Sequence, residues 1–584
     1  MTRAAGLYAA IGILALPLAM PALAQKINDL TPVTDAMLAN PNPADWLMWR
    51  RTLNNWGYSP LDQINRRNVG DLRMVWTRPL ANGDQEGTPL VHDGILFFPN
   101  PSDLTQAFDA ATGEFIWEYR RSVPSDVGQY FPAAPTNRNL AIYDNLILDN
   151  GADGWAYALD AKTGKLVWET QIMDYRHGAK NSSGPIVADG KVVSGRSCEP
   201  EGGPEACVIT AFDAKTGKEV WRHRTIPKPG EPGDETWGGI PYEQRWHVGM
   251  WMVPSYDPET KRVYVGTSVT APAPKFMLAG NNEQYLYHNS TLALDVSTGD
   301  MIWYFQHVVD HWDLDHPFER LIVDTAVEPD PKAVRWINPS AHEGEVRRVI
   351  TGIPGKTGIV YTLDAENGRF LWARETVQQN VVEDINTESG AATVNPDKEF
   401  TAPGQEKLIC PSTSGGKNYP AGTYSPDTGL MYYPLQNTCM MSTSAERTLN
   451  ADENDLYRIR NRVQIAPGEE NVGTLQAISV STGAMAWKHE QRAGMLSLMS
   501  TGGGLVFGGD TNGHFRAYDQ RNGEILWDIN LGAPVNGYPA TFSVDGKQYV
   551  AVSTGGSGLA FGLGRLAPEL HPGSGNQLFV FALP

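Results

Sequence analysis

Short runs of alternating apolar and polar residues fill most of the chain, and many of these runs end in the same kind of turn. The pattern A-x-(D/S)-x-x-(T/N)-G-x-x-x-W, or a close variant, occurs seven times. Alternation with a period of two predicts a β-strand, and Asp-x-x-Thr-Gly predicts a tight turn because glycine readily adopts a positive φ. The residues between the turn and the tryptophan then form the returning strand. The seven copies end at Trp117, Trp168, Trp221, Trp303, Trp372, Trp487 and Trp527.

The spacing of the copies predicts the architecture. Where the motif is regular, its tryptophans are roughly 40 to 55 residues apart, which matches the four-stranded blades of a β-propeller. A tryptophan in every copy gives a flat side chain that can pack between neighbouring sheets. A weaker copy ends at Trp76, and the stretch between Trp372 and Trp487 has room for an extra blade without the motif. We therefore predict an all-β fold, an eight-bladed β-propeller with tryptophan-docking repeats, whose first and last segments close the ring together. Seven blades or an array of sheets are the alternatives.

Two segments interrupt the repeats. Residues 227–244 and 403–450 are rich in glycine, proline and polar residues, a composition that is typical of loops. Long insertions on a propeller can cover one mouth of its channel and carry function. We therefore expect both segments to be long loops.

The first residues predict export. Arg3 is followed by a mostly apolar run over 7–16 and by Ala-Leu-Ala at 22–24. A positive start, a short apolar core and an A-x-A ending are typical of a secretory signal peptide, and the core is too short to span a membrane. We therefore expect a signal peptide over 1–24 and a mature propeller over 25–584, without a membrane span and located in the periplasm. A permanent anchor is the alternative.

The net charge of the chain limits the classes of partner that it can be expected to bind. Acidic residues number 66 and basic residues 47, which gives a formal charge of −19. Nucleic acids bind basic surfaces, so this balance argues against a nucleic-acid partner, and it suits a basic protein partner. The chain has no C-x-x-C-H sequence, so it carries no covalently attached c-type haem.

The repeats, the opening Asn-Trp-Gly-Tyr-Ser-Pro-Leu at 55–61 and the His-Trp-Asp at 311–313 together resemble the alcohol dehydrogenases that depend on pyrroloquinoline quinone (PQQ). The resemblance covers essentially the whole mature chain and is closest to the soluble branch without a cytochrome domain, similar to methanol, ethanol and sorbose-type dehydrogenases. It implies a periplasmic enzyme that oxidises primary or secondary alcohols, with polyols and sugars as further options. Electrons would pass to a soluble cytochrome c-type acceptor. A non-catalytic propeller of the outer-membrane assembly type carries similar repeats and is the alternative.

The resemblance also implies a set of cofactor contacts. PQQ is a planar tricarboxylate o-quinone, so its pocket needs an aromatic face, cations or amide donors for the carboxylates, and a metal beside the reactive carbonyl. An arginine fork suits a carboxylate, and a lysine can stabilise negative charge on the quinone oxygens. The positions that match the cofactor contacts of the family are Glu86, Arg138, Ser182, Trp251, Lys356 and Asn418.

The block 310–315, which reads Asp-His-Trp-Asp-Leu-Asp, carries the catalytic prediction. Asp313 matches the catalytic aspartate of the family, which would take the alcohol proton beside the metal. Asp315 stands where lanthanide-using relatives have an extra carboxylate, and the resemblance implies Ca²⁺ or a lanthanide as the metal. The metal-ligand glutamate is best matched by Glu199, with Glu205 as the alternative. The asparagine ligand of many relatives is missing or replaced by Thr270.

Four cysteines in an exported chain can pair in three ways. We expect Cys410–Cys439, which resembles a disulfide of the family, and Cys198–Cys207, which would staple the loop that carries Glu199. We hypothesise that the second staple stiffens the metal ligand or partly covers the cofactor.

Overall fold

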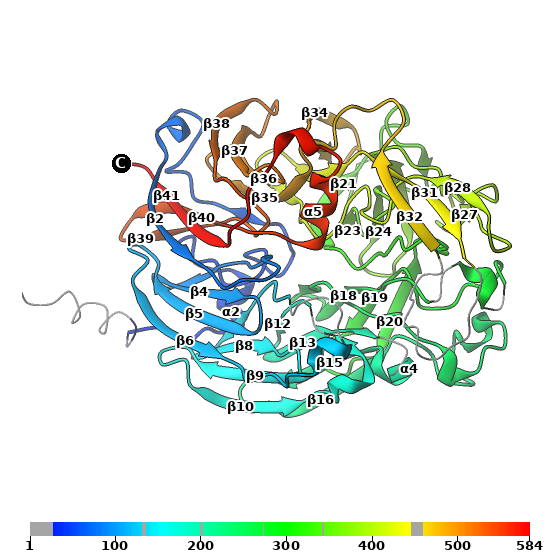
Figure 1. The fold of residues 1–584 in the computed structure, drawn as a ribbon, viewed down its shortest axis with the longest axis horizontal. Helices are drawn as coiled ribbons and strands as arrows, with labels where there is room; N and C mark the ends of the chain where they lie inside the picture. The colour runs from blue at the N-terminus through cyan, green and yellow to red at the C-terminus, as the bar shows by residue number, and fades with distance from the viewer. Residues whose placement is uncertain are drawn as a thin grey trace, which may run out of the picture.

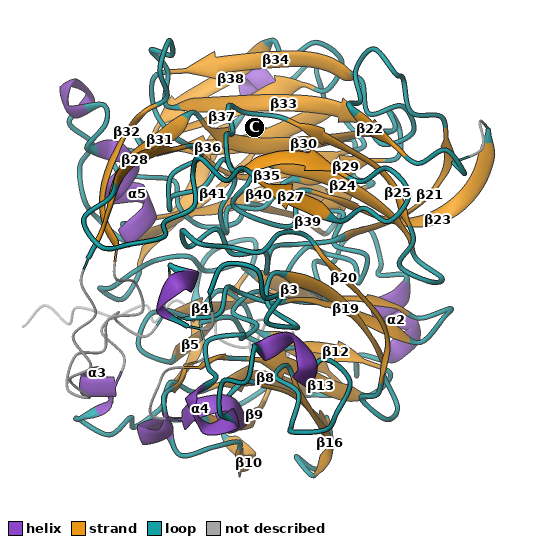
Figure 2. Cartoon of the chain, turned by 90° about the vertical axis from the view of Figure 1, so that its right-hand side faces the viewer, coloured by secondary structure: helices purple, strands orange, loops and turns teal. Residues whose placement is uncertain are grey.

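The computed structural model describes residues 27, 29–130, 136–180, 182–198, 202–271, 274–278, 280–341, 344–445 and 459–584. The predicted signal peptide and Glu199 lie outside the described residues. Short antiparallel sheets dominate the fold and are arranged around a common centre (Figure 1). The α-helices of the described residues are short (Figure 2). They are α2 (Asp35–Ala39), which precedes the first strand, and α3 (Val127–Tyr130), α4 (Gly203–Ala206) and α5 (Gly558–Gly564), which lie in connections between strands. Within the described residues, no helix is long and apolar enough to cross a membrane.

Eight sheets of four or five strands make up the body of the described structure. The first four, in chain order, are β3 (Leu90–His92), β4 (Ile95–Asn100), β5 (Leu104–Asp109) and β6 (Phe115–Arg120); β7 (Ala141–Tyr143), β8 (Leu146–Asn150), β9 (Trp155–Asp160) and β10 (Leu166–Gln171); β12 (Ile186–Ala188), β13 (Lys191–Gly195), β15 (Val208–Asp213) and β16 (Glu219–Arg224); and β17 (Ser255–Asp257), β18 (Arg262–Gly266), β19 (Ser290–Asp295) and β20 (Met301–Gln306).

The other four sheets complete the body. They are β21 (Leu321–Val327), β23 (Glu345–Gly352), β24 (Ile359–Asp364), β25 (Phe370–Glu375) and β22 (Trp336–Ile337); β29 (Thr423–Ser425), β30 (Leu430–Gln436), β33 (Gly473–Ser479) and β34 (Met485–Gln491); β1 (Tyr58–Ser59), β35 (Met495–Thr501), β36 (Leu505–Asp510), β37 (His514–Asp519) and β38 (Ile525–Asn530); and β2 (Arg73–Pro79), β41 (Gln577–Ala582), β40 (Lys547–Thr554) and β39 (Ala540–Val544).

The tryptophans of the repeats fasten each sheet to the next. Trp117 on β6 donates its indole Nε1–H to the carbonyl of Ala161, 3.0 Å away, and its ring lies 2.5 Å from the point where a Cβ on Gly164 would stand. Gly164 has a φ of +68°, so only glycine leaves room for the ring at this turn. The same ring-on-glycine contact occurs at six other pairs: Trp76–Gly113, Trp168–Gly217, Trp221–Gly299, Trp303–Gly368, Trp372–Gly483 and Trp487–Gly523.

The eighth sheet does not lie where the sequence spacing placed it. The stretch between Trp372 and Trp487 contains no additional four-stranded sheet among its described residues. It holds two small sheets, formed by β26 (Val382–Ile385) with β27 (Ala392–Val394) and by β28 (Glu406–Ile409), β31 (Thr438–Ser444) and β32 (Ile459–Ile465). The predicted extra blade is therefore wrong, because these residues pair within insertions. The loop predicted over 403–450 is also wrong in part, since it contains β28 to β31.

The first and last segments supply the remaining sheet. Strand β2, which carries Trp76, pairs antiparallel with β41 from Arg73↔Ala582 to Pro79↔Gln577. Figure 1 shows this joining of the blue and red ends of the chain. The first and last segments therefore share one sheet, as the sequence predicted.

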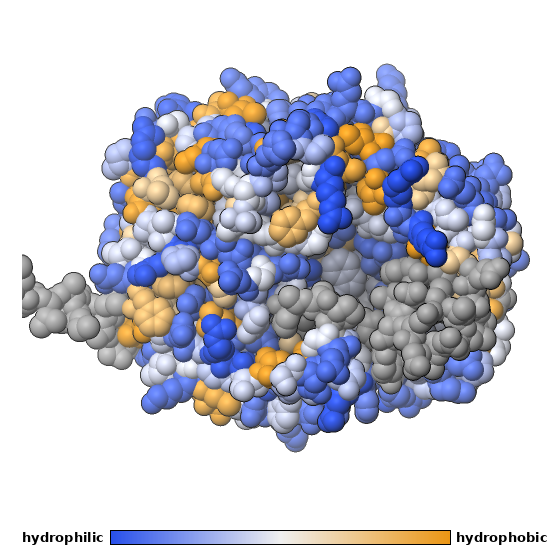
Figure 3. Space-filling view, in the orientation of Figure 1, coloured by the Kyte–Doolittle hydropathy of each residue, from blue (hydrophilic) through white to orange (hydrophobic). Residues whose placement is uncertain are grey.

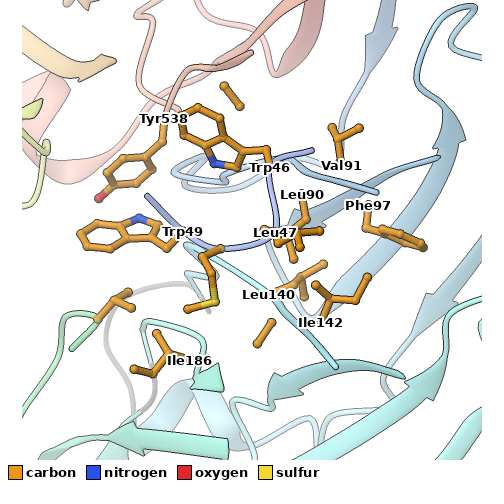
Figure 4. Packing of buried hydrophobic residues seen from close by; sticks show 14 of the residues in the cluster. Trp46, Leu47, Trp49, Leu90, Val91, Phe97, Leu140, Ile142, Ile186 and Tyr538 are labelled. Carbon is orange, nitrogen blue, oxygen red and sulfur yellow. The ribbon is translucent and has the colours of Figure 1, made fainter. Parts of the chain in front are cut away.

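A buried segment before β1 packs against several sheets (Figure 4). The backbone N–H of Trp46 donates to Val91 O at 2.8 Å. The Trp49 ring meets the Tyr538 ring edge-on, with centroids 5.3 Å apart. Leu90 and Ile142, from two neighbouring sheets, are also fully buried in this cluster. The segment thereby ties the beginning of the chain to the core.

On the face that carries α5, hydrophilic residues are interspersed with smaller hydrophobic groups (Figure 3).

Candidate active site

The block 310–315 forms a tight turn between β20 and β21. The Asp310 carboxylate accepts the backbone N–H of Trp312 at 2.6 Å and also that of Leu314. These two bonds close the turn, and Asp313 inside it has a φ of +72°. Left-handed backbone is uncommon for residues other than glycine, and Asp and Asn tolerate it best. The turn therefore holds the Asp313 carboxylate in a fixed direction.

Lys356 brings the two predicted carboxylates together. Its Nζ lies 2.8 Å from Asp313 Oδ1 and 3.1 Å from Asp315 Oδ2. The backbone N–H of Lys356 also donates to Asp315 O at 2.8 Å. The other oxygen of Asp315 accepts the N–H of Val269 at 2.9 Å. Lys356 and Asp315 are buried, at 6% and 4% exposure, and the Asp313 side chain is 15% exposed, so the cluster is largely shielded from water.

Burial and neighbouring charges shift the pKa values of Asp313 and Asp315 in opposite directions. Burial raises the pKa of Asp313 to about 8, although Lys356 opposes the shift. Burial also disfavours the Asp315 carboxylate, but Lys356 and His247 outweigh it and lower the pKa of Asp315. The two carboxylates raise the pKa of Lys356 above its usual value despite burial. A carboxylate whose pKa lies near neutrality is suited to accept and return a proton.

Arg138 organises a second group of predicted residues. Its guanidinium lies 5.4 Å from the Trp251 ring centroid and 4.9 Å from that of Tyr419. Its Nε is 2.6 Å from Glu86 Oε2, and its Nη1 donates to Ser182 O at 2.9 Å. The Ser182 hydroxyl lies 3.3 Å from Trp251 O. Three further predicted cofactor residues, Glu86, Ser182 and Trp251, therefore meet around the buried Arg138 cation.

The loop with Asn418 connects the two groups. The N–H of Gly416 donates to Lys356 O at 2.8 Å, and the Asn418 amide donates to Ser414 O at 3.0 Å. Phe318 meets Trp251 edge-on, with ring centroids 5.4 Å apart. Tyr419, the residue after Asn418, lies against Arg138, so this one loop contacts both the cluster around Lys356 and the group around Arg138.

The residues present fit PQQ. Trp251 offers a partly exposed aromatic face, and Arg138 and Lys356 are cations suited to carboxylate and quinone oxygens. Beside Glu86, the buried Nε2 of Gln85 and Oγ1 of Thr88 have no hydrogen-bond partner among the described residues. Buried polar atoms without a partner are rare. These two could bond to the oxygens of a bound polar molecule.

Two of the predicted metal ligands do not join the cluster. Glu205 lies at the surface with its side chain 51% exposed, in an ion pair with Arg224 at 2.8 Å. Thr270 follows Val269, but its hydroxyl donates to Trp246 O at 3.2 Å and its carbonyl accepts Lys275 Nζ at 2.8 Å. Glu199 lies outside the described residues, so its position stays a prediction.

Both predicted disulfides are present. Cys198 on β14 (Ser197–Cys198) is bonded to Cys207, and Cys410 to Cys439. The described residues contain no free cysteine. The first bond closes the loop that contains Glu199, as the sequence predicted.

Sequence reasoning missed four residues of this region. Asp310 stands inside the recognised block, and Tyr419 follows the recognised Asn418, so both had a local signal. Lys275 and Glu319 had none, because their partners come from other parts of the fold. Lys275, in a 3₁₀ turn (Lys275–Met277), has no exposed surface and lies 5.8 Å over the Tyr285 ring. Burial lowers its pKa to about 8, while Asp310 and Asp315 act in the opposite direction.

Comparison with known proteins identifies the family. The family described as glucose/ethanol/alcohol dehydrogenase, beta-propeller domain (PQQ) matches residues 46–389 and 468–550. The dehydrogenase subunit of the quinone-dependent alcohol dehydrogenase of Komagataeibacter europaeus is 33% identical over 568 residues, covering 91% of this chain and 74% of that one. The quinoprotein alcohol dehydrogenase PedH of Pseudomonas putida is 29% identical over 562 residues, covering 90% and 89%.

A solved structure agrees with this match. A europium-containing methanol dehydrogenase superposes with a TM-score of 0.84 at 26% identity, covering 94% of this chain and 100% of the other. The fold and the site therefore define a quinoprotein dehydrogenase of the β-propeller type. The chain belongs to the PQQ-dependent alcohol dehydrogenase family, whose members use PQQ with Ca²⁺ or a lanthanide ion. The comparisons do not favour the scaffold alternative.

Proposed function

We propose that this protein oxidises a small primary or secondary alcohol to the aldehyde or ketone with PQQ and one metal ion. Polyols and sugars belong to the same proposed substrate class. The observation that carries the proposal is the largely buried cluster in which Lys356 Nζ contacts both Asp313 and Asp315, at 2.8 and 3.1 Å. A non-catalytic propeller has no need to hold two carboxylates and an ammonium in this arrangement.

The residues divide the chemistry between them. When bound, PQQ supplies a quinone that accepts a hydride, and the metal supplies a Lewis acid. Asp313 accepts the hydroxyl proton of the alcohol at its carboxylate. Lys356 orients that carboxylate and keeps a positive charge where negative charge develops. Arg138 binds a cofactor carboxylate and Trp251 provides a flat support. Asp313 and Asp315, with Glu199 as the third ligand, would hold the metal.

The proposal extends to the assembly and the location. Eight described sheets, each with one tryptophan of the repeats, and the pairing of β2 with β41 support a closed ring of eight blades. The residues before Gln25 support export to the periplasm. The formal charge of −19 suits a basic soluble cytochrome c as the electron acceptor.

Reconstitution tests the function. We expect purified apoprotein with added PQQ to reduce an artificial dye when an alcohol and either Ca²⁺ or La³⁺ are present. Activity with La³⁺ alone that is lost in an Asp315→Ala variant would make Asp315 a metal ligand, whereas activity with Ca²⁺ that survives in the variant would assign it to substrate or support. Absence of both activity and cofactor absorbance with either metal would contradict the proposal and favour a scaffold.

The disulfide staple gives a second prediction. A Cys198→Ser/Cys207→Ser variant should bind Ca²⁺ about tenfold more weakly, as happens when the support of a metal ligand is lost. The matched control is Cys410→Ser/Cys439→Ser. With sequence separations of 9 and 29, loop entropy alone predicts stability losses of about 2.6 and about 3.6 kcal/mol. The control should therefore lose more stability yet keep its Ca²⁺ affinity. Equal Ca²⁺ affinity in both variants, measured by calorimetry, would refute the hypothesis that the Cys198–Cys207 disulfide supports the metal ligand.

A further inference from the structure

We propose that Lys275 is a built-in counter-charge of the metal site that sets how strongly the site binds an ion and how it discriminates between divalent and trivalent ions. The inference rests on the proposed function, since it assumes that Asp313 and Asp315 hold the metal. It concerns a residue outside the motifs, and it assigns Lys275 a positioning role rather than contact with the reacting atoms.

The position of Lys275 is the first step of the argument. Its side chain is fully buried, and its Nζ donates to Thr270 O at 2.8 Å. Thr270 occupies the position at which many relatives have an asparagine that binds the metal. The residue before it, Val269, bonds directly to Asp315. The chain therefore places a cation beside the segment that lacks a predicted ligand.

The electrostatic surroundings are the second step. Asp310 and Asp315 both attract the Lys275 ammonium, yet the described residues include no carboxylate within ion-pair distance of it. A buried charge is normally paired directly or placed close to an opposite charge. When all are ionised, Asp310, Asp313 and Asp315 carry three negative charges against two on Lys275 and Lys356. Lys275 thus balances the region as a whole instead of one partner.

The consequence for metal binding follows from Coulomb's law. A fixed positive charge repels a bound cation with an energy proportional to the charge of the ion. Removal of the charge should therefore tighten binding of both ions. The logarithm of the affinity gain for La³⁺ should be one and a half times that for Ca²⁺.

Two neutral variants separate charge from packing. Lys275→Gln removes the charge and keeps an N–H donor for Thr270 O, whereas Lys275→Met removes both. In PQQ-loaded, metal-stripped protein, calorimetry with CaCl₂ and LaCl₃ should show Ca²⁺ binding about tenfold tighter in each variant and La³⁺ binding about thirtyfold tighter. Lys215→Gln, a change at a side chain 61% exposed, is the control and should leave both affinities unchanged.

The outcomes distinguish this inference from the function on which it rests. Weaker binding in Lys275→Met with wild-type binding in Lys275→Gln would make Lys275 a hydrogen-bond anchor and overturn the inference. Equal gains for the two ions, or no gain, would also overturn it while leaving the metal site intact. Failure of the wild-type protein to bind either ion would instead remove the metal site itself, and the inference with it.

Discussion

Replacement of Asp313 by asparagine should lower kcat/KM for alcohol oxidation by about a thousandfold, within the range expected for loss of a general base. The amide cannot take the hydroxyl proton, and Lys356 Nζ would lose the carboxylate that it contacts at 2.8 Å. The fold should survive, because asparagine tolerates the φ of +72° that Asp313 adopts as well as aspartate does. Steady-state dye reduction at saturating PQQ and metal measures the effect, so that weaker metal binding is not mistaken for lost chemistry.

A second aspartate provides the matched control. Asp545, in the turn between β39 and β40, also has a positive φ, of +50°, and is exposed. Asp545→Asn makes the same chemical change in the same backbone conformation far from the motifs, and should leave kcat/KM unchanged. An Asp313→Asn variant that kept more than a tenth of the wild-type kcat/KM would show that another group takes the proton.

The repeated part of the fold was predictable from the sequence, whereas the structure of the inserted segments was not. Each motif combines a period-two strand, a glycine turn and a tryptophan, and these local features also determine the contact of Trp117 with the turn at Gly164. The strands β28, β29, β30 and β31 were missed because they lie in a segment, residues 403–450, that is rich in glycine, proline and polar residues. Such strands are stabilised by partners elsewhere in the chain, and composition does not identify the partners.

The site was predictable to the extent that its residues belong to recognised blocks. Asp313, Asp315 and Lys356 meet as expected, and so do Glu86, Arg138, Ser182 and Trp251. The balancing charges were not predictable, because Lys417 and Glu319 are 98 residues apart and no periodicity relates them. A lysine or glutamate in a sequence is usually exposed, so burial of an ion pair emerges only from the fold.

That buried ion pair gives the last prediction, which concerns stability. Lys417 Nζ lies 2.7 Å from Glu319 Oε2, and neither side chain is exposed. The other Glu319 oxygen accepts the N–H of Gly422 at 2.8 Å. Glu319 also attracts Arg50 and Arg320, so in the part of the chain that the structure describes it is the one carboxylate that compensates these three buried cations. Loss of Glu319 should therefore be more damaging than loss of any one of its partners.

We expect Glu319→Gln to lower the free energy of unfolding by about 3–5 kcal/mol, the range measured when one partner of a buried ion pair is removed. Lys417→Met should have a smaller effect, because Glu319 would still face two arginines and methionine fills much of the same space beside Phe318. Lys215→Met, which breaks an exposed pair with Asp144, should be nearly neutral. Urea unfolding followed by tryptophan fluorescence measures all three variants. If Lys417→Met were as damaging as Glu319→Gln, the pair would act as an isolated salt bridge, and the shared role of Glu319 would be refuted.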